Sequence, residues 1–159
     1  MREPIVSVLS ITYNHAPYIA HAIESFLSQQ TTFSFEIVIG EDCSTDKTRD
    51  IVLDFARRYP DMIRVVISEH NVGVVPNFLR TFAACRGKYV AMCEGDDYWH
   101  HPQKLQRQVD FLEANPEFGM VHTDFDTVFI NSSEVVTGWF AAHNVSFRPE
   151  NDVHVPMLL

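Results

Sequence analysis

The sequence lacks the motifs that mark several common classes of nucleotide-binding protein. It has six glycines in 159 residues, and neither G-x-G-x-x-G nor G-x-x-x-x-G-K-[ST] occurs. A dinucleotide held by a glycine-rich loop on the first helix is therefore disfavoured. No apolar run approaches the roughly 20 residues that a membrane-spanning helix needs, so we expect no transmembrane segment.

Cysteine and positive charge are also scarce. The three cysteines, Cys43, Cys85 and Cys93, include no C-x-x-C pair, so we expect neither a disulfide framework nor a structural zinc site. A formal net charge of −9 disfavours a broad surface for nucleic-acid phosphates. The negative net charge is still compatible with binding of a small anionic ligand, provided that a cation mediates the contact. Without a leader-like N-terminus, a cytoplasmic location is expected, with attachment to the inner face of a membrane as a second possibility.

What the sequence does contain is a regular alternation of strand and helix patterns. Apolar, β-branched runs predict strands at residues 5–12, 35–40, 62–68, 88–93 and 119–123. Between them, apolar residues with helical spacing predict helices near residues 19–27, 51–59, 75–83 and 102–112. This order predicts the α/β class, with a mostly parallel sheet and helices on both faces. We expect one domain over residues 1–159, weakly defined from about 126, where strands near 128–130 and 135–139 would form a hairpin.

Ligands of such sheets bind beyond the carboxyl ends of the strands, so the residues that follow each strand are candidates. Thr12, Tyr13 and Asn14 follow the first strand, where the tyrosine either stacks on a flat base or simply forms a turn. Glu41 and Asp42 follow the second strand. A carboxylate there can accept hydrogen bonds from a base or ribose, or serve the start of the next helix.

The densest group of acidic residues follows the fourth strand. Glu94, Asp96 and Asp97 lie within four residues of one another. Two like charges about 4 Å apart repel by roughly 4 kcal/mol at an effective dielectric constant near 20, so such a group favours a bound cation or a shared proton. Carboxylate oxygens suit Mg²⁺ or Mn²⁺. The alternative is an exposed turn whose charges point into water, with the following His100 and His101 on the surface.

Taken together, these segments resemble the family 2 glycosyltransferases. VSVLSITYNHAPYIAHAIESFLSQ is similar to the family's first strand, Tyr-Asn turn and helix, and EDCSTDKT to its D-D-G-S-x-D segment. NVGVVPNF, then ACRGKYVAMCEGDDYW and the following P-x-K-L, resemble its acid-x-acid region. The resemblance covers about residues 4–125. It implies the GT-A (Rossmann-like) fold, a nucleotide-sugar donor and a divalent cation, Mn²⁺ or Mg²⁺.

The resemblance also implies roles for individual residues. The residues implied to meet the nucleotide are Thr12, Tyr13, Asn14, Glu41, Asp42 and Asp96. Tyr13 would stack on the base, and Asp42 would accept a hydrogen bond from it, most naturally from uracil N3–H, which favours a UDP-sugar. Asp97 would ligate the metal with Asp96, and Glu94 and Trp99 would lie in a second tier. The sequence departs from the pattern where Glu41 and Glu94 replace the usual Asp, and where Cys43 replaces Gly.

The implied reaction is transfer of a sugar to an acceptor hydroxyl with inversion, in polysaccharide or glycoconjugate synthesis. The acceptor would be a saccharide, a lipid-linked molecule or another hydroxyl compound. In the family a carboxylate from a later segment is the general base, which we expect beyond Leu159, so the fold would be C-terminally incomplete. Two alternatives stay open: a donor-binding remnant without the base, and a nucleotidyltransferase. The latter would normally carry a phosphate loop rich in glycine and lysine.

Overall fold

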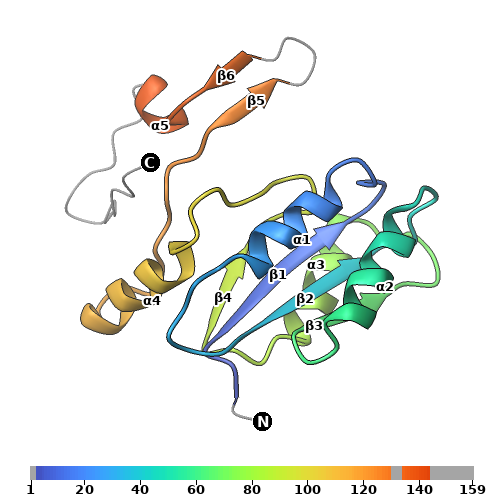
Figure 1. Ribbon diagram of the computed structural model, residues 1–159, viewed down its shortest axis with the longest axis horizontal. Coiled ribbons are helices and arrows are strands. Elements are labelled where there is room, and N and C mark those ends of the chain that lie inside the picture. Colours follow the sequence, from blue (N-terminus) through green and yellow to red (C-terminus); the bar gives the residue numbers. More distant parts are fainter. Residues whose placement is uncertain (1–2, 130–133, 144–159) are drawn as a thin grey trace. The chain divides into compact units, whose positions relative to one another are not determined.

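The computed structural model describes residues 3–129 and 134–143. The chain divides into two compact units, Met1–Gln106 and Arg107–Leu159, and each is described by itself. The expected single domain over residues 1–159 therefore stays a prediction. Figure 1 shows the elements of both units along the chain.

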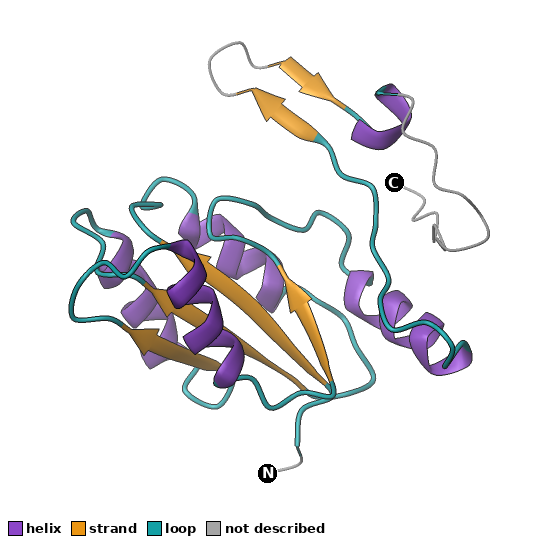
Figure 2. Cartoon of the chain, turned by 180° about the vertical axis from the view of Figure 1, so that it is seen from behind, coloured by secondary structure: helices purple, strands orange, loops and turns teal. Residues whose placement is uncertain are grey.

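A four-stranded parallel sheet forms the centre of the first unit. Its strands are β1 (Val6–Thr12), β2 (Phe35–Glu41), β3 (Ile63–Ile67) and β4 (Tyr89–Met92). Their order is β3-β2-β1-β4, and all three pairings are parallel (Figure 2). Every residue of β1 is buried, as a near-continuous apolar strand covered on both faces should be. The expected parallel α/β sheet is confirmed.

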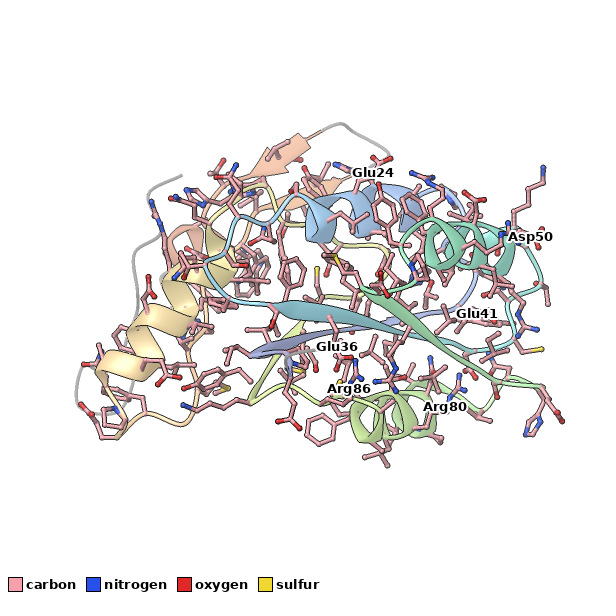
Figure 3. The ribbon with its side chains drawn as sticks, turned by 60° about the horizontal axis from the view of Figure 1, so that its bottom comes forward. Glu24, Glu36, Glu41, Asp50, Arg80 and Arg86 are labelled. Atoms are coloured by element: carbon pink, nitrogen blue, oxygen red, sulfur yellow. The ribbon has the colours of Figure 1, made fainter. Side chains whose placement is uncertain are left out.

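Helices cover both faces of this sheet, as the alternating pattern predicted. Figure 3 shows α1 (Ile19–Leu27) and α2 (Thr48–Arg58) on one face and α3 (Val74–Ala83) on the other. Ile19, Ile23 and Phe26 of α1 are fully buried at the spacing of one helix face. They form the core on the α1 side of the sheet, together with the apolar residues of β1 and β2.

The helix α3 docks on the sheet through polar side chains. Asn77 and Thr81 are buried, and the Asn77 side-chain amide donates to the Gly40 carbonyl at 3.0 Å. A Cβ on Gly40 would lie 2.0 Å from Thr81 Oγ1, so glycine is required for this close approach. The sequence pattern predicted the helix correctly, but its apolar residues Val75 and Leu79 are exposed.

A buried ionic network lies on the α3 side of the sheet. Glu36 is 2% exposed, and its carboxylate accepts hydrogen bonds from Ser7 Oγ at 2.7 Å and from Arg86 Nη2 at 2.6 Å. Arg64 Nη1 lies 3.3 Å from the same carboxylate (Glu36 and Arg86 are labelled in Figure 3). Burial alone would raise the pKa of Glu36, but the Arg86 and Ser7 hydrogen bonds outweigh it and hold the pKa below its usual value.

The strand order creates a switch point between β1 and β4. After β3 the chain crosses back through α3 to the other side of β1, so the β1–β2 and β3–β4 connections run over opposite faces of the sheet. The loop after β4 folds over the end of β1, because the Gly95 N–H donates to the Ile11 carbonyl at 3.0 Å. Ligands of open parallel sheets bind in this kind of crevice.

The second unit holds most of α4 (Lys104–Ala114), then β5 (Thr127–Phe129), β6 (Glu134–Val136) and the short α5 (Trp139–Ala142). β5 and β6 pair antiparallel, which confirms the expected hairpin; its turn at 130–133 lies outside the described residues. None of the helices in the described part of the chain has the length and apolar character that crossing a bilayer requires.

The prediction of a strand at residues 119–123 is wrong. A single bridge at His122 is the only strand-like residue there. The segment is instead tied to α5: the His122 ring contacts Phe140 edge-on, and Asp124 accepts the Phe140 N–H at 3.1 Å. An apolar run of five residues is too short for periodicity to decide its structure.

Candidate functional site

The first side of the site is the end of β1. Thr12 is 2% exposed, and its carbonyl accepts the Asp42 N–H at 3.1 Å, which ties the ends of β1 and β2 together. A Cβ on Gly95 would lie 2.8 Å from Thr12 Oγ1, so the backbone after β4 passes directly over this threonine. Thr12 Oγ1 has no hydrogen-bond partner among the described residues. The next residue, Tyr13, is 40% exposed at the mouth.

Asn14 joins the loops that follow β1 and β2. It adopts a left-handed backbone conformation with φ of 57°, which asparagine tolerates better than most residues. Its N–H donates to Ser44 Oγ at 3.0 Å, and its side-chain oxygen accepts the Thr45 N–H at 2.8 Å. Asn14 therefore builds the turn that presents Tyr13. Its predicted contact with a nucleotide stays a prediction.

Glu41 is completely buried at the end of β2 (labelled in Figure 3). One carboxylate oxygen accepts the Ser44 N–H at 2.7 Å, and the other accepts a hydrogen bond from Arg49 Nε. Arg49 Nη2 in turn donates to the Ser68 carbonyl at 2.8 Å. The hydrogen bond with Glu41 raises the pKa of Arg49. Glu41 thus fixes the loop between β2 and α2, and its predicted nucleotide contact stays a prediction.

Asp42 holds the loop that follows β3. It is 2% exposed, and its two carboxylate oxygens accept the backbone N–H groups of Val72 and Gly73, each at 2.9 Å. Gly73 precedes α3 and has φ of 87°, which glycine adopts without strain. The carboxylate therefore sets where the loop leaves β3 and where α3 begins. The base contact expected of Asp42 stays a prediction.

The acidic turn after β4 brings Asp96 and Asp97 to the switch point. Both are exposed, while Gly95 before them is buried, and the Asp97 N–H closes the turn on the Glu94 carbonyl at 3.2 Å. Partial burial, and then the negative charge of Asp96, raise the pKa of Asp97 against the opposing influence of His15. The negative charge of Asp96 therefore disfavours the charged form of Asp97.

His15 is a candidate that the sequence reasoning missed. Its Nδ1 atom lies 3.6 Å from Asp96 Oδ1 and has no hydrogen-bond partner among the described residues. The histidine comes from the loop after β1, so it reaches the acidic turn across the switch point. Its position directly after the Tyr13-Asn14 turn was the signal available in the sequence.

Aromatic contacts anchor the acidic turn to α1. The Trp99 ring packs on Phe26 with centroids 4.9 Å apart, and the Trp99 N–H donates to Ser25 Oγ at 3.1 Å. The Tyr98 ring stacks on His21 at 4.2 Å. Trp99, expected in a second tier, lies behind the turn as a support. Glu94 lies at the exposed outer side of the turn.

The residues at the turn fit a cation that substrate helps to bind. Within residues 3–129 and 134–143, no three side chains of His, Cys, Asp or Glu converge to hold a metal alone. Mg²⁺ and Mn²⁺ commonly take one or two carboxylates and complete their shell with water and substrate phosphates. The two exposed carboxylates of Asp96 and Asp97 match such a donor set.

A parallel sheet in the order β3-β2-β1-β4, with helices on both faces, is the architecture of the GT-A class. The model of the family described as glycosyl transferase family 2 matches residues 7–149. The chain therefore belongs to the family 2 glycosyltransferases.

The chain is similar to several curated proteins, two of which are named as glycosyltransferases. An uncharacterised protein of Mycobacterium tuberculosis is 45% identical over 112 residues, which is 70% of this chain and 32% of the relative. An uncharacterised glycosyltransferase of Nostoc is 38% identical over 117 residues, or 74% of this chain and 35% of the relative. The E. coli enzyme WfaP, named as a UDP-Glc:alpha-D-GlcNAc-diphosphoundecaprenol beta-1,3-glucosyltransferase, is 31% identical over 87% of this chain and 51% of its own length. The chain thus spans about a third to a half of these relatives.

Solved structures share the fold. S. aureus TarS in complex with UDP is 28% identical, with a TM-score of 0.61 over 70% of this chain and 32% of TarS. The mannosyltransferase PcManGT of Pyrobaculum calidifontis, solved with GDP-Man and Mn²⁺, has a TM-score of 0.63 over 78% of this chain and 36% of its own. At 23% identity, the latter likeness establishes the fold alone.

Proposed function

We propose that this chain binds the donor of a metal-dependent inverting glycosyltransferase, with a UDP-sugar as the favoured donor. The observation that carries the proposal is that the turn with Asp96 and Asp97 folds over the end of β1, which exposed Tyr13 directly follows. Tyr13 stacks on the base, and the two carboxylates hold Mn²⁺ or Mg²⁺. The cation, when bound, supplies charge neutralisation for the leaving diphosphate.

Several residues of this chain prepare the site for that ligand. Thr12 supports the Gly95 backbone, which places the acidic turn over the end of β1. His15 faces Asp96, with its Nδ1 atom 3.6 Å from the carboxylate. Asp42 fixes the loop at Val72 and Gly73, so the mouth keeps its shape before the nucleotide arrives. A prearranged site loses less conformational entropy on binding.

UDP is favoured over GDP because of the closer relatives. TarS, at 28% identity, was solved with UDP, and at 27% identity with UDP-GlcNAc. WfaP carries UDP-Glc in its name. In this proposal the nucleobase is uracil, and the sugar stays open.

The transfer step belongs to the whole protein. The chain spans about a third of its mycobacterial relatives, and no described residue is assigned as the general base. We propose that the base lies beyond Leu159, so that this chain alone binds donor without transferring the sugar. The acceptor would be a saccharide or lipid-linked hydroxyl used in polysaccharide or glycoconjugate synthesis. We propose a cytoplasmic site of action, consistent with three free cysteines.

Calorimetry with UDP and GDP, each with and without MnCl₂, tests the proposal. UDP should bind more tightly than GDP, and removal of the metal should weaken UDP binding by at least about tenfold, because the carboxylates then repel the diphosphate. Asp97→Asn should also remove the metal dependence. Asp50→Asn, the same charge change on the exposed side of α2 (labelled in Figure 3), is the matched control. UDP binding that ignores both metal and Asp97 would refute the metal site.

A further inference from the structure

The outward face of α3 is apolar and exposed. Val75, Leu79 and Phe82 are 65%, 59% and 51% exposed, and their spacing places them on one side of the helix. We call these three residues the α3 apolar face. The opposite side, with Asn77 and Thr81, is the one that docks on the sheet. The way α3 docks on the sheet keeps the α3 apolar face exposed, because rotating the helix to bury it would break the hydrogen bond from Asn77 to Gly40.

The charge around this face is entirely positive in sequence. Residues 70–93 contain no Asp or Glu, although the whole chain has 21 acidic residues against 12 basic ones. The charged residues of this stretch are Arg80, Arg86 and Lys88. Figure 3 shows Arg80 and Arg86 on the α3 side of the sheet. In an acidic chain, a stretch of this length without Asp or Glu gives α3 and its neighbouring segments a locally basic character.

Nearby acidic groups offset this charge only in part. Glu36 of β2 is a single carboxylate, and it pairs with both Arg86 and Arg64. Arg80 donates to the Asn77 side chain and to the Glu41 carbonyl, both of which are neutral. Glu3 also acts on Arg86, and Asp42 binds the backbone directly before α3. Four basic residues (Arg64, Arg80, Arg86 and Lys88) against three carboxylates (Glu3, Glu36 and Asp42) leave a small net positive charge next to the exposed apolar stripe.

We propose that the α3 apolar face docks on the surface of an anionic lipid membrane. An exposed apolar helix face with a basic rim has the chemistry of a helix that lies in the interface of a bilayer. Anionic headgroups attract the arginines and the lysine, while Val75, Leu79 and Phe82 enter the boundary of the acyl chains. A second copy of this chain fits less well, because two basic rims would face each other across the interface. This inference goes beyond donor binding and does not depend on it.

Sedimentation of the full chain with vesicles tests the inference. Vesicles with equal parts of phosphatidylglycerol and phosphatidylcholine should bind the chain, and phosphatidylcholine vesicles should bind it far less. Leu79→Glu and Phe82→Glu should each weaken binding by at least about tenfold, because each replaces an apolar side chain that would enter the membrane with a negative charge that the anionic lipids repel. Lys88→Ala should weaken it about fivefold. Added salt should weaken it further.

Met120→Glu is the matched control, since Met120 is a 75% exposed apolar residue of the second unit. It should leave vesicle binding unchanged, and all variants should keep the thermal midpoint of the parent chain. Equal loss for Met120→Glu, or no binding to anionic vesicles, would overturn the inference. The inference would also be overturned if the chain did not bind vesicles but formed a dimer in light scattering, and if Leu79→Glu dissociated that dimer. UDP titration of the same variants separates the two proposals, because Leu79→Glu should leave UDP affinity unchanged.

Discussion

Arg86 forms an ion pair with the buried carboxylate of Glu36, and its Nη2 lies 2.6 Å from Glu36 Oε2. The pair joins β2 to the segment that leads from α3 into β4. The Glu36 side chain is 3% exposed, whereas that of Arg86 is 55% exposed. The carboxylate therefore depends on its partners, while the guanidinium still reaches water.

Glu36→Gln should lower the free energy of unfolding by about 3 kcal/mol. The substitution weakens the hydrogen bonds that the buried carboxylate accepts from Arg86 and Ser7, and hydrogen bonds to a charged group contribute about 1.5–3 kcal/mol. Urea unfolding followed by circular dichroism measures the change. Glu24→Gln, on the exposed side of α1, is the matched control and should change the stability by less than about 0.5 kcal/mol. Equal effects of the two substitutions would contradict the assigned network.

The same carboxylate makes stability depend on pH. Because the pKa of Glu36 is lowered from 4.5 by folding, the unfolded chain binds its proton first as the pH falls. The stabilisation is therefore complete above 4.5 and is lost as the pH falls through the lower pKa of the folded state. Unfolding curves across this range should show a steeper loss in the parent chain than in Glu36→Gln. Parallel curves would show that another group is responsible.

Asp42→Asn should release the loop at Val72 and Gly73. The asparagine keeps one acceptor oxygen and replaces the other with a donor group that cannot accept an N–H. One of the two backbone N–H groups then loses its partner, at a cost of about 1–3 kcal/mol. Hydrogen exchange resolved at Val72 and Gly73 should become faster, while exchange in α2 should stay the same. Unchanged exchange at both amides would argue against the role of the Asp42 carboxylate in holding this loop.

Tyr13→Ala should weaken UDP binding by about 1–3 kcal/mol, the range measured for a base stacked on an aromatic ring. Tyr13→Phe should retain most of the affinity, since stacking needs the ring and not the hydroxyl. Tyr59→Ala removes a tyrosine of similar exposure, 38%, at the end of α2 and is the control. Calorimetry in the presence of Mn²⁺ gives the comparison. Equal affinity for Tyr13→Ala and the parent chain would place the base elsewhere.

Much of the fold could be predicted because local patterns and packing agree in the first four strands. The run at 5–12 is apolar throughout, and β1 is buried throughout. The run at 119–123 has the same character over five residues, yet side-chain contacts with α5 replace strand pairing there. A short apolar run carries too little information to separate the two outcomes.

The location of the candidate site could be predicted from the sequence, but the contacts of its individual residues could not. Acidic residues after β2 and β4 could be read as ligand contacts because the carboxyl ends of parallel strands meet. What a carboxylate binds depends on which backbone groups fold over it. Glu41 and Asp42 are buried under loops that donate hydrogen bonds to them, while Asp96 and Asp97 stay exposed.

The sequence by itself determined the α/β class, the order of its elements and the acidic turn, because these follow from residue types at short spacing along the chain. Tertiary structure alone decided which face of α3 is buried and that His15 meets Asp96. Both depend on residues far apart in sequence: Gly40 admits the polar side of α3, and the crossover to β4 carries Asp96 to the loop after β1.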